Sequence, residues 1–308
     1  MPAIWATYSP AIPVMGHCPY LCTEAPMITT ILADNAGPFT GPGTQSHVFG
    51  DDQTCVVIDP GPALEAHYEN IMAATQGRDI AAILLTHRHG DHAEMAPYLA
   101  ERLGVRILAF PIDPEQSWRA APSRFHDHVV HDSINQDDEI SVGTLKLKVH
   151  HTPGHCFDHV AFEWREEGQI FVGDTVMGWS STAIIQPEGN MAEYRSSMRK
   201  LYQLHANILI PTHGDPIKQP HSRLELLMKH REKRELEILQ ILTDTPKKLS
   251  DLRREIYPNL PENLFGGAET SILSHLLDMA SRGMAMIDDD GATNGFNAQP
   301  DPEIWLLH

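Results

Sequence analysis

Short apolar runs alternate with helix-like segments along the first part of the chain. Segments 62–76 and 93–103 predict helices, and the runs around them predict strands at 27–33, 47–50, 55–59, 80–86 and 105–110. The run Ile80–Thr86 is continuously apolar, which is typical of a strand buried on both faces. Together these segments predict a β-α-β order.

The middle of the chain predicts a second series of strands. Residues 145–150 alternate between apolar and polar, as a half-buried strand does. Segments 161–164 and 169–172 predict a hairpin around the turn 166–168. A helix at 191–204 and a short strand at 208–211 follow. The chain therefore has two β-rich halves that each end in helices, with polar motifs at the ends of strands.

The pattern changes near residue 220. Residues 222–225 form a capping box that predicts the start of a long helix reaching about Leu242. Further helices are predicted near 249–256 and 268–282, and a β-ribbon at 285–287 and 304–307 around the turn 288–291. Three helices and a ribbon predict a winged-helix-like α+β unit. We therefore expect an N-terminal extension at 1–26, a catalytic domain at 27–220 and a winged-helix-like domain at 221–308.

The composition is that of a globular protein, because 42% of the 308 residues are apolar and 21% are charged. The formal net charge of −18 repels nucleic acid and anionic membranes at long range. The Pro-rich start lacks the basic segment of a signal peptide, and no run approaches the roughly 18–20 apolar residues of a membrane span. We expect a cytoplasmic protein that does not enter a membrane.

The cysteines do not form a disulfide framework. The chain has four of them, Cys18, Cys22, Cys55 and Cys156, without the dense, even pattern of small secreted domains. Reduced thiols in the cytosol are therefore expected. Cys18 and Cys22 lie beside His17, but no second pair completes four ligands, so we interpret them as structural thiols rather than as a zinc site.

Histidine is abundant, with 19 residues, and one cluster stands out. Within six positions directly after the strand at 80–86 lie His87, His89, Asp91 and His92. Imidazole and carboxylate ligands without a thiolate suit Zn²⁺, Mn²⁺ or Fe and argue against a structural zinc finger. A polar loop that is His-rich by chance is the weaker alternative. One short loop cannot enclose a metal, so further ligands must come from elsewhere.

Three more donor residues follow predicted strands. His155 lies in the segment 152–155 (TPGH), Asp174 follows the strand at 169–172, and His213 follows the strand at 208–211. Each has Gly or Pro beside it, which fixes the local backbone. Each alone is a weak signal, because a polar residue at a strand end is more often a surface group. Their common placement after the dense motif predicts a shared metal site.

These motifs resemble those of the metallo-beta-lactamase superfamily. The matching segments, in the order and spacing of that family, are Thr86–His92, Thr152–His155, Gly173–Asp174 and His213–Gly214. The resemblance covers roughly residues 27–220 and implies an α/β fold, an αββα sandwich with its metals at one edge. It implies two divalent metal ions, with Zn²⁺ as the first expectation and Mn²⁺ or Fe as alternatives.

The resemblance also implies the roles of the ligands. Three residues would hold the first metal: His87, His89 and His155. Three would hold the second: Asp91, His92 and His213. Asp174 would bridge the two metals.

Two metals a few ångströms apart have a clear chemical use. A water between them becomes hydroxide near neutral pH and attacks a carbonyl or phosphoryl centre. Asp91 is placed both to bind a metal and to act as the catalytic acceptor of the proton of that water. Asp59 and His159 are candidates for orienting the ligands, with a purely structural role as the alternative for each.

The substrate is less well defined. The bridging Asp174 points to the branch that hydrolyses thioesters, lactones and phosphodiesters. Segments 35–38, 43–44 and 258–264, with the expected winged helix, resemble a beta-lactamase-like group that includes an endoribonuclease of single-stranded RNA. Gln45 and His47 depart from that group, as does the Pro-rich extension.

Three functions therefore remain open. The first is hydrolysis of a small carbonyl substrate, and the second is cleavage of single-stranded RNA. The third is a non-enzymatic, winged-helix nucleic-acid-binding regulator, for which segment 268–282 is poorly basic, with Arg282 against Glu269 and Asp278. Residues 221–255 carry nine basic against seven acidic side chains, a pattern more typical of helix-surface charge pairs than of an RNA-binding face. The N-terminal extension and the helix at 222–242 are candidate surfaces for a homodimer.

Overall fold

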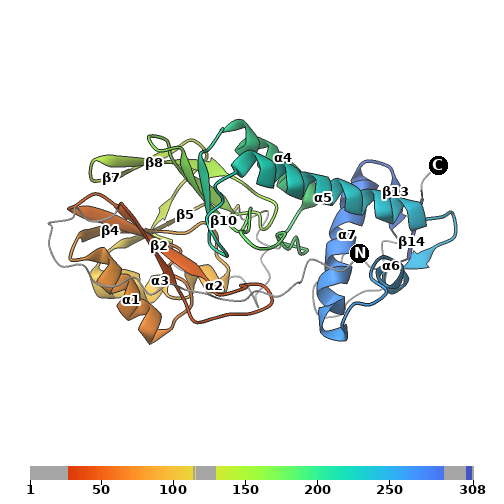
Figure 1. The fold of residues 1–308 in the computed structure, drawn as a ribbon, viewed down its shortest axis with the longest axis horizontal. Helices are drawn as coiled ribbons and strands as arrows, with labels where there is room; N and C mark the ends of the chain where they lie inside the picture. Colours follow the sequence, from red (N-terminus) through yellow and green to blue (C-terminus); the bar gives the residue numbers. More distant parts are fainter. Residues whose placement is uncertain (1–26, 114, 116–129, 288–302, 307–308) are drawn as a thin grey trace.

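The computed structural model describes residues 27–113, 115, 130–287 and 303–306 (Figure 1). Two facing sheets form one part of the molecule, with helices on both outer sides, and a group of helices with a small sheet forms the other. The long helix α5 runs from the first part to the second. Cys18 and Cys22, the extension at 1–26 and the turn at 288–291 lie outside the described residues.

The first sheet contains six strands in chain order. These are β1 (Ile28–Leu32), β2 (Gln45–Gly50), β3 (Thr54–Ile58), β4 (Asp79–Leu84), β5 (Arg106–Ala109) and β6 (Asp132–Ser133). The first three are antiparallel, and β3 to β6 are parallel. Parallel neighbours need a crossover, and the crossovers from β3 to β4 and from β4 to β5 are helical. The crossover helices are α1 (Glu65–Thr75), α2 (Gly90–Ala93) and α3 (Ala96–Leu103).

The second sheet has the order β11-β10-β9-β8-β7. Its strands are β7 (Glu139–Val142), β8 (Leu145–His151), β9 (Val160–Trp164), β10 (Gln169–Gly173) and β11 (Ile208–Pro211). The predicted hairpin of β9 and β10 is confirmed by their antiparallel register. The helix α4 (Met191–Gln203) connects β10 to its parallel neighbour β11, and its N-terminus is capped by the side chain of Asn190. The strands β6 and β7 were not predicted.

Three apolar layers hold the sandwich together. Val57 packs in the layer beneath α1 and α3, whereas its neighbours Val56 and Ile58 pack between the two sheets, as the two-residue period of a strand requires. Met198 and Leu201 of α4 pack against the outer face of the second sheet. Each fully buried side chain of this size contributes about 1.5–3 kcal/mol. The helices and sheets that these apolar layers join form the predicted αββα sandwich.

The C-terminal part has its own apolar cluster. Its helices are α5 (Pro220–Ile241), α6 (Leu249–Ile256) and α7 (Phe265–Ser281), with a short 3-10 helix at Glu262–Leu264. A small sheet, β12-β14-β13, joins Lys247–Lys248, Glu303–Leu306 and Ala285–Ile287. The three helices, β13 and β14 come in the predicted order, whereas β12 and the 3-10 helix were not predicted. The predicted capping box is wrong, because α5 begins at Pro220, after Gln219, and Ser222 lies within its first turn. No helix of the described residues is both long and apolar enough to cross a membrane.

His275 of α7 makes the stability of this part sensitive to acid. Burial, with Arg231, Arg234 and Arg195 nearby, lowers its pKa from 6.5 to about 2. Below pH 6.5 the unfolded chain binds a proton there that the folded chain does not, so this stability is complete above pH 6.5 and is lost as the pH falls. In His275→Leu we expect the free energy of unfolding to fall less steeply between about pH 6 and 4, by about 1.4 kcal/mol per pH unit. Urea unfolding at each pH measures this, and equal slopes in both proteins would contradict it.

Candidate metal centre

The seven predicted ligand residues meet at one edge of the sandwich. The dense motif follows β4, His155 lies between β8 and β9, Asp174 follows β10 and His213 follows β11. Their donor atoms form overlapping groups in which all atoms lie within 4.8 Å of one another. The groups are His87, His89, His155 and Cys156; His87, His92 and Asp174; and Asp91, His92 and His213.

The first group is a convergence of three imidazoles. Nδ1 of His89 lies 2.9 Å from Nε2 of His87 and 3.0 Å from Nε2 of His155. All three residues are buried. Three ring nitrogens therefore face one point, which is the arrangement that a metal ion needs.

The second group combines imidazole with carboxylate. Nε2 of His213 lies 3.2 Å from Oδ2 of Asp91, and Nε2 of His92 lies 3.7 Å from the same oxygen. Both histidines are buried, whereas the Asp91 side chain is 29% exposed. The one carboxylate of this group therefore lies at the solvent side.

Asp174 stands between the two groups. Its Oδ2 lies 3.6 Å from Nε2 of His155, in the first group. Its Oδ1 lies 3.4 Å from Nε2 of both His92 and His213, in the second group. The two oxygens of one carboxylate thus face different sets of donors.

Several donor atoms of the centre lack a hydrogen-bond partner in the described part of the chain, a place that a bound metal would take. Among the described residues of this centre, three ligand atoms are buried without a hydrogen-bond partner: His92 Nε2, His213 Nε2 and Asp174 Oδ1. Burying polar atoms without partners is costly, and a cation at this point would satisfy all three. Imidazole nitrogen and carboxylate oxygen suit Zn²⁺, Mn²⁺ or Fe.

Asp59 holds two of the histidines from behind. Its Oδ2 lies 2.9 Å from Nδ1 of His92 and accepts a hydrogen bond of 2.6 Å from the Thr86 hydroxyl. The Thr86 oxygen in turn lies 3.1 Å from Nδ1 of His87. With Nδ1 engaged in this way, Nε2 of each ring is directed into the site. The geometry supports the orienting role predicted for Asp59.

His159 forms a hydrogen bond with the backbone of Asp174 and stacks on the ring of the ligand His87, with the two ring centroids 5.1 Å apart. The Asp174 N–H donates to Nε2 of His159 at 3.0 Å, and Nδ1 of the ring lies 2.9 Å from the Thr152 hydroxyl. The ring is fully buried. It therefore fixes the start of the segment that carries Asp174.

Three further orienting groups were missed by the sequence analysis. The Glu188 carboxylate lies 2.9 Å from Nε2 of His89, and the carbonyls of Ala183 and Gly43 lie 2.8 and 3.2 Å from Nδ1 of His155 and His213. Two of these are backbone atoms, which any residue type supplies. Glu188 is 99 residues from His89 and belongs to no motif. Only the fold brings these groups to the ligands.

Burial and charge set the protonation of the site. Burial and the neighbouring histidines hold the pKa of His87 well below its usual range, so this ring is neutral and able to bind a metal. Burial opposes charge on Asp174, but His213 and His92 outweigh it and keep the pKa of this carboxyl well below its usual value. Burial also opposes charge on His92, yet the carboxylates of Asp91 and Asp174 raise its pKa well above the ordinary value. The His92 ring must therefore release a proton to bind a metal.

Family membership follows from the sequence around this centre. Residues 40–213 match the protein-family model described as the metallo-beta-lactamase superfamily. The chain belongs to the metallo-beta-lactamase superfamily. It is accordingly a metal-dependent hydrolase of that superfamily, as the resemblance implied.

Relatives in the superfamily match over most of their length. A Drosophila melanogaster protein named beta-lactamase-like protein 2 homolog is 27% identical over 299 residues, which cover 93% of this chain and 99% of that protein. A protein of Aspergillus fumigatus named atrochrysone carboxyl ACP thioesterase is 29% identical over 227 residues, covering 73% of this chain and 67% of that protein. This chain is therefore similar both to proteins named only for their fold and to a named thioesterase.

Solved structures of the superfamily share this fold. A metallo-beta-lactamase family protein from Thermus thermophilus superposes with a TM-score of 0.73 and 20% identity, covering 91% of this chain and 99% of that one. A beta-lactamase domain protein from Burkholderia ambifaria gives the same TM-score and identity, with 92% of each chain covered. Because more than nine-tenths of this chain is covered in both cases, the shared fold extends beyond the sandwich to the C-terminal elements.

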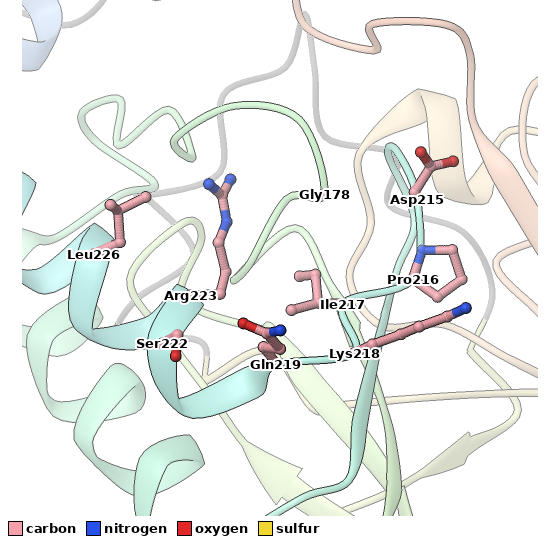
Figure 2. Close-up of a pocket in the computed structure, with 9 residues that line it drawn as sticks. All are labelled: Gly178, Asp215, Pro216, Ile217, Lys218, Gln219, Ser222, Arg223 and Leu226. Atoms are coloured by element: carbon pink, nitrogen blue, oxygen red, sulfur yellow. The ribbon is translucent and has the colours of Figure 1, made fainter.

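A surface pocket of about 470 Å³ lies beside the loop that follows His213. Figure 2 shows its lining, which comes from the loop after His213, the first turns of α5 and the loop at Gly178. The Gly178 N–H donates to the His213 carbonyl at 2.8 Å, which joins two of these segments directly. The start of α5 therefore lies close to the second ligand group.

Proposed function

We propose that this chain is a two-metal hydrolase of small acyl substrates, either thioesters or lactones. The observation that carries the proposal is the placement of Asp174, whose Oδ1 and Oδ2 face separate groups of donors. A site for one metal has no need of a carboxylate between two sets of ligands. Zinc is the first candidate, because the donors are mainly imidazole.

The geometry supports the ligand sets that the resemblance implies. One metal would be held by His87, His89 and His155, the other by Asp91, His92 and His213, with Asp174 shared. When bound, such metals lower the pKa of a coordinated water and stabilise the negative charge that develops on an attacked carbonyl.

Asp91 is the proposed catalytic acceptor of the proton of the attacking water. Its carboxylate is the most exposed of the ligand groups, with 29% of the side chain accessible, while Asp174 is only 6% accessible. A group that exchanges protons with solvent must reach solvent, so Asp91 is better placed than Asp174. Asp59 and His159 are proposed to hold the ligands and not to touch the substrate.

Two observations favour an acyl substrate. The Aspergillus fumigatus relative is named as an acyl-carrier-protein thioesterase. The second is that many basic side chains of the C-terminal part form ion pairs, which leaves them poorly available for phosphates. The pairs are Lys229–Glu225, Lys233–Glu237, Arg234–Glu237, Lys247–Glu255, Arg253–Glu269 and Arg254–Asp251.

Cleavage of single-stranded RNA remains the second candidate. It rests on the resemblance of segments 35–38, 43–44 and 258–264 to the group that includes an endoribonuclease of single-stranded RNA. A non-enzymatic regulator is not supported. The helix α7, which would have to read nucleic acid, buries Ile272, Leu276 and Met279 in the C-terminal cluster.

One experiment separates the two candidates. Zinc-loaded protein is incubated with a panel of acyl thioesters and lactones and, separately, with labelled single-stranded RNA. We expect turnover of the acyl substrates, its loss after chelation and its return with added zinc. RNA cleavage with intact thioesters would replace the first candidate by the second. Activity that survives complete chelation, verified by mass spectrometry, would overturn both.

A further inference from the structure

The loop between β10 and α4 holds two ligands of the first group from behind. Its Ala183 carbonyl lies 2.8 Å from Nδ1 of His155, and the buried Glu188 carboxylate lies 2.9 Å from Nε2 of His89. Such contacts set which nitrogen of a histidine faces the metal and raise its basicity. The position of this loop therefore controls the first group.

The C-terminal helices hold this loop by its backbone carbonyls. Arg231 of α5 donates to the Thr182 carbonyl, and the Ser274 hydroxyl of α7 lies 2.6 Å from the Ile184 carbonyl. These two carbonyls flank that of Ala183. The Ser274 hydroxyl also lies 3.0 Å from an oxygen of its own helix, but the contact across to the loop is shorter.

A third contact anchors the start of the same loop. Arg223 of α5 donates to the carbonyls of Met177 and Ser180 at 2.7 and 2.5 Å. Figure 2 shows its side chain rising from α5 towards the loop that carries Gly178. Within the loop, the Thr182 hydroxyl donates to the Asp174 carbonyl at 2.8 Å. The loop is thus fixed between α5 and α7 on one side and the metal centre on the other.

Arg231 gives the clearest evidence that the C-terminal helices hold this loop. It is 4% exposed, yet among the residues that the structure describes it forms no ion pair. Its contacts are the Thr182 carbonyl and the ring of Tyr194, whose centroid lies 5.2 Å from the guanidinium carbon. Burying a charge without a counter-ion is costly, and an apolar side chain would fill the same space at lower cost. A specific hydrogen bond to the loop is a reason to keep the charge there.

We propose that α5 and α7 position the first ligand group through this loop, with Arg231 and Ser274 as positioning residues. The inference rests on the proposed two-metal function. The imidazoles of the second group are held differently, by Asp59 behind His92 and the Gly43 carbonyl behind His213. Loss of the Arg231 and Ser274 contacts, which flank Ala183, therefore weakens the first metal and spares the second.

The test compares metal binding in matched variants of the full chain. The test variants are Arg231→Met and Ser274→Ala. One control is Arg234→Met, on the same helix as Arg231, because the Arg234 side chain contacts Glu237 and the ring of Tyr257 rather than the loop. The other is Ser281→Ala, on the same helix as Ser274, with a bond to its own backbone. Metal-free protein is titrated with Zn²⁺ against a chromophoric chelator, and thermal unfolding is recorded for each protein without metal.

We expect the parent protein and both controls to bind two equivalents of Zn²⁺. The test variants should bind one of the two equivalents about 10–100-fold more weakly. In a His89→Ala background, which disables the first group, Arg231→Met should change nothing. In a His213→Ala background, which disables the second, it should weaken the remaining equivalent. Arg231→Lys, which can still donate to the loop carbonyl, should recover part of the affinity.

The possible failures are distinguishable. If the parent binds fewer than two equivalents, the two-metal proposal itself is overturned. If it binds two and Arg231→Met weakens both equally, or lowers only the unfolding temperature, then Arg231 has a merely structural role and the positioning inference is overturned.

Discussion

Asp174→Ala is expected to lose metal and nearly all hydrolytic activity while the fold survives. The substitution removes the one carboxylate that faces both ligand groups, and it leaves Asp91 as the remaining carboxylate beside Nε2 of His92 and of His213 among the described residues. Two metals without a shared carboxylate also repel each other more strongly. Loss of several kcal/mol of transition-state stabilisation corresponds to a fall in kcat/KM of about a thousandfold or more. Metal content by mass spectrometry, kcat/KM and circular dichroism measure the three parts of this prediction.

The matched control is Asp79→Ala. Asp79 is exposed and starts β4, the strand whose other end leads to the dense motif, so it tests loss of a carboxylate without loss of a ligand. We expect it to keep two equivalents of metal and its activity within about twofold. Full metal occupancy in Asp174→Ala would refute the bridging role. A loss of folded structure would show that the activity falls because the protein is less stable and not because a ligand is missing.

Gly154→Ala is expected to cause a large loss of stability through a single added methyl group. The residue before His155 has φ of +135°, a conformation that glycine alone adopts readily, and a Cβ there would lie 2.3 Å from the Cα of Tyr194. The backbone of α4 cannot move aside as a side chain could. Backbone strain of about 1–3 kcal/mol and overpacking of about 1–3 kcal/mol add to about 2–6 kcal/mol. Urea unfolding of the metal-free protein measures the loss.

Gly104→Ala separates the two causes of that loss. Gly104 also has positive φ, +67°, but a Cβ there would meet no atom within 4 Å. It should cost only the left-handed backbone penalty, about 1–2 kcal/mol. If Gly154→Ala is no worse than Gly104→Ala, then the approach of α4 to the segment before His155 is not tight, and the fold places His155 less strictly than we argue.

Local patterns were enough to predict most elements of the sandwich. Continuous apolar runs such as Ile80–Thr86 predicted strands, because a strand with two buried faces has no polar positions. The short strands β6 and β7 were missed, since Glu139–Val142 alternates between polar and apolar residues over only four positions and β6 has only two residues. The start of α5 was misplaced because Ser222 resembles a cap, whereas Pro220 fits the first turn equally well.

The donor residues of the candidate centre could be predicted from the chain alone. His87, Asp174 and their partners stand directly after strands, and the ends of neighbouring strands meet at one edge, so their convergence is a consequence of chain order. The tertiary structure sets which atom of each donor residue faces the candidate centre. That depends on partners distant in sequence, such as Glu188 behind His89 and the Ala183 carbonyl behind His155. No local pattern encodes them, because every residue type has a backbone carbonyl. The role of a buried carboxylate such as Glu188 depends on the side chains that packing places beside it.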